Sequence, residues 1–276
     1  MRWIRLIVLG AVQGLTEFIP VSSSGHLVLF QRLLGLEYEG ITLEVAVHMG
    51  TLVAVLAVYG RDILKIGGTL LRSSWGMFRG KMRFKDAVRE PRFYLGASLL
   101  VATSITAAIA LPLSDVIQGM FGNLRLVAVA WLVTGGLLYG TRGYKPLGRL
   151  PTVGSTILIG IFQALATVPG ISRSGATIAA GLYSGLSREE AARFSFLLSV
   201  LAIVGASILD IPEALPRVTE AGFLADILVA TASAAISGYF ALRFIIKKVI
   251  RGEMHRFALY VWSLATVVLV WLNFSL

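Results

Sequence analysis

Apolar residues occur in this chain as long uninterrupted runs rather than in alternation with polar ones. Six runs approach or exceed the length of about 20 mostly apolar residues that a helix needs to cross a bilayer: 42–60, 93–113, 124–140, 190–212, 223–246 and 255–275. None has the short apolar core and small-residue cleavage site of a signal peptide, so we expect the amino terminus to be retained. The pattern predicts an all-α polytopic membrane protein, with residues 1–276 forming a single integral membrane domain.

Two further apolar stretches, 3–36 and 152–186, are each interrupted midway by Pro, Gly and Ser. These residues free backbone groups that lipid cannot satisfy, so such breaks occur only where the backbone is buried in protein or lines a wet cavity. We therefore predict two re-entrant helical hairpins, each of which enters and leaves the membrane on one side.

The two interrupted stretches are similar in register. When the numbering is shifted by 150, eight of 27 positions are identical without a gap; they are Gly10, Gln13, Leu15, Ser22, Ser24, Gly25, Gly35 and Leu36 against Gly160, Gln163, Leu165, Ser172, Ser174, Gly175, Gly185 and Leu186. This indicates an internal repeat of one hairpin plus three spans, about 1–142 and 151–276. An odd number of spans separates the hairpins, so the repeat has inverted topology, an architecture whose site lies at the repeat interface.

Composition agrees with a bilayer protein: 56% of the residues are hydrophobic, 14% are charged and the mean hydropathy is +0.80. The net charge of +10 is unevenly placed, because the predicted topology puts 19 of the 25 Lys and Arg residues on one side, nine of them in a loop at 61–92. The positive-inside rule assigns that side to the cytoplasm and both termini to the outside. The basic excess is therefore a topology signal that also attracts anionic lipids, and it does not call for a nucleic-acid partner. The absence of Cys excludes disulfides and Cys-ligated metals.

Ionisable side chains within membrane segments are costly and mark functional sites. Gln13 and Glu17 are four residues apart, so they lie on one helix face. Glu44 and His48 repeat that spacing at the start of the first span. For a single histidine such as His48, a packing role is the more common one.

The two breaks have the residue types of an anion site. Ser22, Ser23 and Ser24 begin a short helix that carries His26, and free N–H groups and the helix dipole at such a start attract anions. The second break repeats this from Ser172 to Thr177, with Arg173 in register with Ser23. If the loops meet, they form a phosphate site whose further candidate ligands are Ser22, Ser24, Ser172, Ser174, Gly175 and Thr177.

These groups also have the parts for phosphoryl chemistry. The hydroxyl of Ser23 can attack phosphorus if a base such as His26 takes its proton, and Arg173 can pair with phosphoryl oxygens. Glu17, Gln13 and Glu44 offer oxygen ligands for a divalent cation, Mg²⁺ or Ca²⁺. No Walker loop or dinucleotide motif is present, so no nucleotide cofactor is expected.

The segments 13–26, QGLTEFIPVSSSGH, and 169–177, PGISRSGAT, resemble the two signatures of the undecaprenyl-diphosphate phosphatases, also called bacitracin-resistance proteins. The resemblance implies an integral membrane hydrolase that removes the terminal phosphate of undecaprenyl diphosphate and so recycles the lipid carrier for cell-wall synthesis. It implies that Ser23 is the nucleophile with His26 assisting, and that Arg173 binds the diphosphate. A divalent cation at the carboxylates of the first signature, an extracytoplasmic site and a homodimer are implied too.

This chain departs from the family pattern at two positions. Gln13 stands where many members have Glu, and His48 stands where some relatives have Gln, so the choice among Mg²⁺, Ca²⁺ and Mn²⁺ stays open. Direct attack by water, with Ser23 as a ligand, is a variant of the mechanism. The alternative from another class is a transporter or flippase for polyprenyl phosphate lipids, which the inverted repeat favours. A structural or channel subunit does not account for Arg173 beside two serine-rich breaks.

Overall fold

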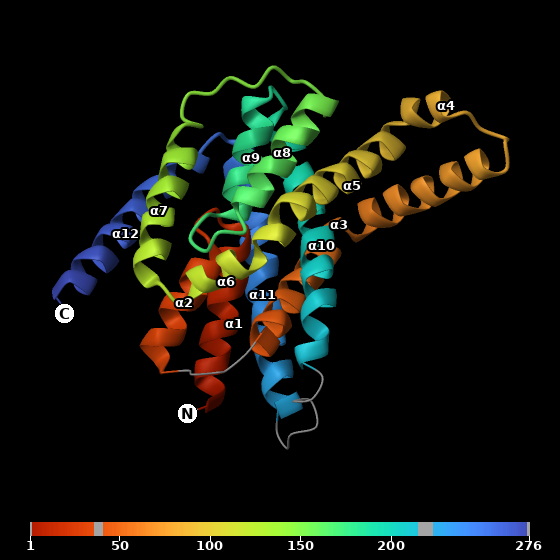
Figure 1. The fold of residues 1–276 in the computed structure, drawn as a ribbon. Helices are drawn as coiled ribbons and strands as arrows, with labels where there is room; N and C mark the ends of the chain where they lie inside the picture. Colours follow the sequence, from red (N-terminus) through yellow and green to blue (C-terminus); the bar gives the residue numbers. More distant parts are fainter. Residues whose placement is uncertain (1, 36–40, 215–222, 275–276) are drawn as a thin grey trace.

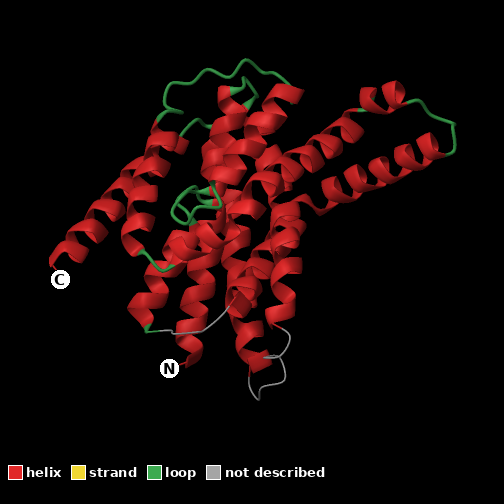
Figure 2. Cartoon of the chain, viewed as in Figure 1, coloured by secondary structure: helices red, strands yellow, loops and turns green. Residues whose placement is uncertain are grey.

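The computed structural model describes residues 2–35, 41–214 and 223–274. Within those ranges the chain forms helices joined by turns, and no β-strand occurs (Figures 1 and 2). The helices are α1 (Arg2–Phe18), α2 (Ser23–Leu34), α3 (Ile41–Phe78), α4 (Phe84–Arg89), α5 (Pro91–Ala110), α6 (Ser114–Phe121), α7 (Leu124–Tyr139), α8 (Val153–Leu165), α9 (Arg173–Tyr183), α10 (Arg188–Ala214), α11 (Phe223–Ile250) and α12 (Phe257–Phe274), with 3-10 turns η1 (Leu111–Leu113) and η3 (Met254–Arg256).

Each predicted span contains one helix, namely α3, α5, α7, α10, α11 or α12. Five helical segments of the described chain are long and apolar enough to cross a membrane: Leu43–Phe78, Pro91–Phe121, Arg188–Leu209, Phe223–Ile250 and Met254–Phe274. The sixth, α7, is apolar but has only 16 residues. The predicted all-α polytopic membrane class is confirmed.

The loop predicted at 61–92 is largely helical, so that prediction was wrong. Helix α3 runs for 38 residues, roughly 57 Å at 1.5 Å per residue, whereas the hydrocarbon core is about 30 Å thick. Lys and Arg are good helix formers, and Ile63, Ile66 and Leu70 continue an apolar face toward α5 and α10. Charge therefore ended the apolar run without ending the helix, and Figure 1 shows α3 and α5 projecting together from the body.

Equivalent helices of the two predicted repeats make matching contacts. Helix α1 packs on α11 and α8 packs on α5, while α3 contacts α10 and α7 contacts α12. The close approach of α1 to α11 and of α8 to α5 depends on two glycines that are in register between the repeats. A Cβ on Gly10 would lie 2.4 Å from the carbonyl oxygen of Ala230, and a Cβ on Gly160 would lie 2.9 Å from that of Ala102. The division into repeats stays a prediction, which these contacts support.

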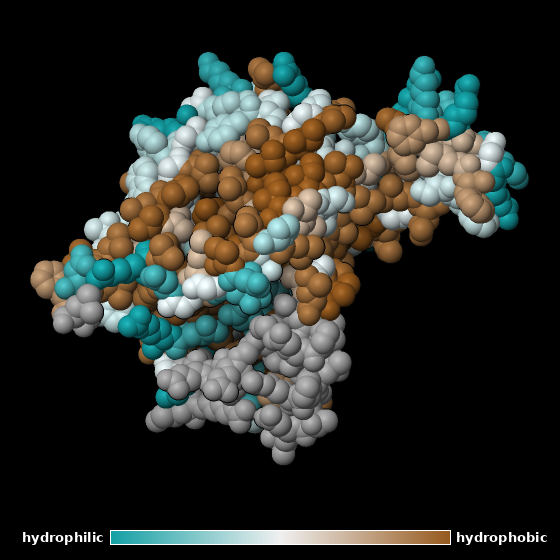
Figure 3. Space-filling view, in the orientation of Figure 1, coloured by the Kyte–Doolittle hydropathy of each residue, from teal (hydrophilic) through white to brown (hydrophobic). Residues whose placement is uncertain are grey.

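The two helical hairpins enter the body from opposite ends (Figure 1). The amino terminus and the end of α2 lie at one end, the start of α8 and the end of α9 lie at the other, and the two turns meet between them. Figure 3 shows hydrophilic residues on the rims and a broad hydrophobic band between them, the arrangement expected across a bilayer.

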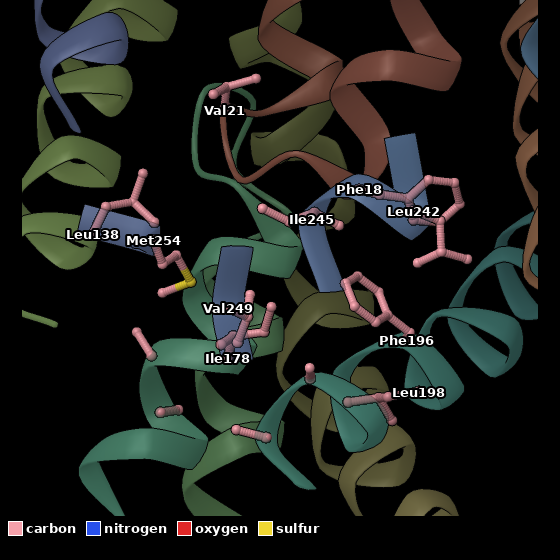
Figure 4. Close-up of a cluster of buried hydrophobic side chains, with 14 of the residues drawn as sticks. Phe18, Val21, Leu138, Ile178, Phe196, Leu198, Leu242, Ile245, Val249 and Met254 are labelled. Atoms are coloured by element: carbon pink, nitrogen blue, oxygen red, sulfur yellow. The ribbon is translucent and has the colours of Figure 1, made fainter. Parts of the chain in front are cut away.

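A hydrophobic core lies beside the two turns and joins α1, α7, α9, α10 and α11 (Figure 4). Phe18, fully buried at the end of α1, meets Phe196 of α10 edge to face at 6.1 Å between ring centroids. Because Phe18 directly follows Glu17, this packing sets the position of that carboxylate.

Candidate active site

The first turn is held in an unusual backbone conformation. Ser22, the N-cap of α2, has φ 69° and is the sole non-glycine residue with positive φ among those the structure describes. Such a conformation costs of order 1–3 kcal/mol and persists where the surroundings enforce it. The Ser22 hydroxyl accepts a hydrogen bond from the Gly25 amide at 3.4 Å and lies 3.2 Å from the Ser24 hydroxyl.

The second turn is built in the same way. Ser172 caps α9 and accepts from the Gly175 amide at 3.1 Å, and its hydroxyl lies 3.3 Å from that of Ser174. Here the positive φ, 99°, falls on Gly170. Thr134 of α7 fastens the turn, since its hydroxyl donates to the Gly170 carbonyl at 2.8 Å and accepts from the Ser172 amide at 3.1 Å.

Glu17 joins the two turns. Its Oε1 accepts from Arg173 at 2.5 Å, and its Oε2 accepts from the Ser23 hydroxyl at 2.6 Å and from the Gln13 amide at 3.0 Å. Arg173 also donates to the Ser195 carbonyl of α10 at 3.5 Å. Glu17 is 7% exposed. The two loops therefore meet, which was the condition for a shared site, and the Glu17 carboxylate lies between the Ser23 hydroxyl and the Arg173 guanidinium.

Helix starts converge on this carboxylate. Ser23 is the first residue of α2 and Arg173 the first of α9, each directly after its capping serine, as the sequence register indicated. Ser23, Ser24 and Arg173 are half-buried rather than sealed. The positive ends of both helix dipoles and the guanidinium thus favour an anion at an accessible point.

His48 lies at the site instead of packing elsewhere. Its Nε2 is 3.8 Å from Glu17 Oε2, and its side chain is 30% exposed. Its Nδ1 lies 2.7 Å from the carbonyl oxygen of Glu44, and since a carbonyl only accepts, Nδ1 carries a hydrogen and the ring turns Nε2 toward Glu17. Glu44 lies one turn earlier on α3 and is half-buried.

The prediction that His26 takes the proton of the Ser23 hydroxyl is not supported by its contacts. Its Nδ1 lies 2.7 Å from the Ser22 carbonyl oxygen and its Nε2 lies 2.8 Å from the Tyr260 hydroxyl, so both ring nitrogens are engaged. The hydrogen of Ser23 goes to Glu17 instead. Helical spacing pointed to His26 because both residues lie on α2, whereas Glu17 precedes the break and Tyr260 is 234 residues away from His26.

Several predicted phosphate ligands serve the hairpin itself. Ser172, Ser174 and Thr177 are at most 2% exposed. Thr177 shares a hydrogen bond of 2.6 Å with the Ser195 hydroxyl, and Ser22 is likewise buried as a cap. Their hydroxyls stabilise the turns, and the amide of Gly175 is taken by its cap. Among the predicted ligands, Ser24 and Arg173 are half-buried, whereas Ser22, Ser172, Ser174, Gly175 and Thr177 are buried.

The oxygen donors for a cation are sparse. Within the described ranges no three His, Asp or Glu side chains stand close enough to hold a metal ion. However, Gln13 Oε1 is buried and has no hydrogen-bond partner, and its amide group lies against Glu17. An unsatisfied buried acceptor beside a carboxylate fits a hard cation that takes its other ligands from a phosphate.

A family model and curated relatives match this chain over nearly its full length. The family model described as bacitracin resistance protein BacA matches residues 6–267. Curated relatives named undecaprenyl-diphosphatase include those of Desulforapulum autotrophicum, 42% identical over 269 residues and 96% of each chain, and Desulfatibacillum aliphaticivorans, 37% identical over 274 residues, 98% of this chain and 99% of the relative. That of Desulfosudis oleivorans is 43% identical over 277 aligned positions and 98% of each chain.

Proposed function

Because this chain belongs to the bacitracin resistance protein BacA family, we propose that it is a membrane phosphatase that hydrolyses undecaprenyl diphosphate to undecaprenyl phosphate and inorganic phosphate. The product is the lipid carrier reused for cell-wall synthesis. Relatives named for this hydrolase are 36–43% identical over nearly the full chain. The observation that carries the mechanism is the 2.6 Å hydrogen bond from Ser23 to Glu17, with Arg173 on the other carboxylate oxygen.

In the first step Ser23 attacks the terminal phosphorus. The diphosphate draws the Arg173 guanidinium toward its oxygens, where charge-assisted bidentate hydrogen bonds are strong. Glu17 then loses its ion-pair partner and takes the Ser23 proton as general base. The new bond is Oγ–P, the bond to the bridging oxygen breaks, and undecaprenyl phosphate leaves with the electron pair.

In the second step water cleaves the phosphoserine. Glu17 now holds a proton and returns it to the Ser23 oxygen as the O–P bond breaks. The oxygen of the water forms the new bond to phosphorus, and both of its hydrogens leave on the inorganic phosphate. Arg173 and the amino-terminal ends of α2 and α9 stabilise the charge on the phosphoryl oxygens throughout. His48 Nε2, 3.8 Å from Glu17 Oε2, stands close enough to order the attacking water.

We also propose that a divalent cation assists. Gln13 and Glu17 would hold it through oxygen, with Glu44 of α3 adding charge, and the phosphates would complete its coordination. Such an ion neutralises negative charge on the substrate and on the leaving group.

The enzyme is proposed to lie in the cell membrane with its site open to the extracytoplasmic face. The α1–α2 hairpin, which carries Ser23, opens at the end with few basic residues, and the positive-inside rule puts that end outside. A homodimer also stays a prediction, and light scattering of the detergent-solubilised protein measures it.

The assay is phosphate release from undecaprenyl diphosphate by purified protein in detergent. Ser23→Ala is expected to lower kcat by at least about 10³-fold, because the nucleophile is lost. Ser24→Ala, which removes the neighbouring hydroxyl, is the matched control and keeps a measurable rate. Substrate labelled with ³²P at the terminal phosphate should label the wild-type protein after rapid quenching. Activity in Ser23→Ala refutes the nucleophile, and turnover without labelled protein supports direct attack by water.

Lipid movement is the second candidate function, favoured by the two hairpins that open to opposite faces. Ser23→Ala protein in liposomes separates the activities, since transfer of a polyprenyl phosphate between leaflets without hydrolysis would establish transport. No transfer by either the wild type or the variant would exclude it.

A further inference from the structure

Among the described residues, one hydrogen-bonded chain leads from α12 to the strained residue before the nucleophile. The Tyr260 hydroxyl lies 2.8 Å from His26 Nε2, and His26 Nδ1 lies 2.7 Å from the Ser22 carbonyl oxygen. A carbonyl oxygen only accepts, so Nδ1 carries the hydrogen of the neutral ring, Nε2 has a lone pair, and Tyr260 donates to it. One tautomer of His26 is selected, and it is the tautomer that leaves neither nitrogen free for Ser23.

The imidazole of His26 also contacts two aromatic rings, those of Tyr260 and Trp131. Its ring stacks on that of Tyr260 with centroids 5.8 Å apart and planes 9° apart, and it meets Trp131 edge to face at 5.3 Å. Trp131 is fully buried on α7, and a Cβ on Gly25 would lie 2.7 Å from its indole nitrogen. Helices α7 and α12, which pack on each other, thereby clamp the first turn of α2.

These contacts of His26 constrain the backbone of Ser22, whose carbonyl oxygen the ring contacts. It holds φ 69° without being glycine, and its carbonyl oxygen accepts from both the His26 amide and the His26 ring. The next residue is Ser23, whose hydroxyl must stay 2.6 Å from Glu17 to lose its proton. A small rotation of the Ser22 peptide would carry that hydroxyl away from the carboxylate, because effective proton transfer needs hydrogen-bond distance.

We propose that Tyr260 is a positioning residue for the phosphatase reaction: it fixes the His26 tautomer that holds the Ser22 carbonyl, and so aims Ser23 at Glu17. This rests on the proposed function. In this arrangement His26 is also a positioning residue, and Glu17 is the base.

A double-mutant cycle on kcat tests the chain of contacts. Tyr260→Phe keeps the stacked ring and removes the hydroxyl, so kcat should fall about tenfold, the effect of one lost hydrogen bond, with KM unchanged because Arg173 stays in place. His26→Asn keeps an N–H near Ser22 but loses the contact with Tyr260, so its kcat should be comparable to that of Tyr260→Phe. Adding Tyr260→Phe to His26→Asn should change kcat less than about twofold, since the hydroxyl then has no partner.

Two controls isolate the role. Tyr183→Phe loses a hydroxyl that donates to the Leu137 carbonyl at 3.0 Å and should leave kcat unchanged. His26→Leu, which removes the donor, should be at least about tenfold slower than His26→Asn. Equal inactivity of the Asn and Leu variants would show that His26 transfers a proton, and additive effects of Tyr260→Phe and His26→Asn would show that Tyr260 acts otherwise. Either result overturns the proposal.

Nitrogen-15 NMR of the histidines gives a readout independent of activity, and the chain has only three. The signals missing in His26→Asn identify His26; in the wild type they should show a protonated Nδ1 and a bare Nε2, and the Nε2 signal should move in Tyr260→Phe. A protonated Nε2 overturns the proposal. If the wild type releases no phosphate, the proposed function fails, while the NMR result still decides the tautomer.

Discussion

Replacing Glu17 by Gln removes one charge and almost no volume from the centre of the site. Gln has a single acceptor oxygen, so it cannot accept from Arg173 on one side and from Ser23 and Gln13 on the other, as the carboxylate does. The Arg173 side chain is 15% exposed, so its guanidinium would be left largely buried and uncompensated. Removing one partner of a buried pair costs about 3–5 kcal/mol, and the partial exposure favours the lower end.

A loss of about 3 kcal/mol is expected to lower the melting temperature by about 6–12 °C for a chain of this size. The loss of the proton acceptor for Ser23 should lower kcat by about 10²–10⁴-fold. Thermal unfolding in detergent and phosphate release measure the two effects separately.

A second substitution separates stability from chemistry. In Glu17→Gln combined with Arg173→Met both charges are absent, so most of the lost stability should return, while activity stays lost. Asp86→Asn is the matched control, because Asp86 pairs with Arg83 at the surface and an exposed pair contributes less than about 1 kcal/mol. Near-normal turnover in Glu17→Gln would refute the base, and a double variant no more stable than the single one would refute the ion-pair reasoning.

Two further predictions concern packing and orientation. Gly160→Ala would bring a Cβ to 2.9 Å from the Ala102 carbonyl oxygen and should destabilise the protein by about 1–3 kcal/mol. Gly60→Ala meets open space and should be neutral or stabilise the protein by up to about 1 kcal/mol. Thermal unfolding compares the two variants, and equal shifts in melting temperature would contradict the packing argument. Because the chain has no Cys, Arg5→Cys and Lys145→Cys introduce unique thiols at exposed positions. A membrane-impermeant maleimide on intact cells should label the first and not the second, and the reverse pattern would invert the topology.

Much of the architecture followed from pattern alone. Runs of apolar residues located the spans, and the breaks at Pro20 and Pro169 located both turns, because lipid tolerates no unsatisfied backbone. The charged segment after Arg61 misled the prediction, since basic residues are compatible with a helix and Ile66 and Leu70 kept an apolar face through it. The polarity of a segment indicates whether it lies in water or in lipid, and it does not by itself indicate whether the segment is helical.

At the site, too, local sequence predicted some features and tertiary packing decided others. Residue types and register placed Ser23 and Arg173 at helix starts, because capping serines, glycines and helical spacing are local properties of the chain. Two of the partners at the site are distant in sequence, since Arg173 reaches Glu17 across 156 positions and His26 reaches Tyr260 across 234. The partner of Ser23, Glu17, is only six residues away but lies on the other side of the break. Helical periodicity stops at a break, so it could not relate Glu17 to Ser23. Proton transfer depends on the 2.6 Å contact between Ser23 and Glu17, which lie on either side of the break. Arg173 and Tyr260, from the other half of the chain, contact the residues on both sides of that break, and no spacing along the sequence encodes this packing.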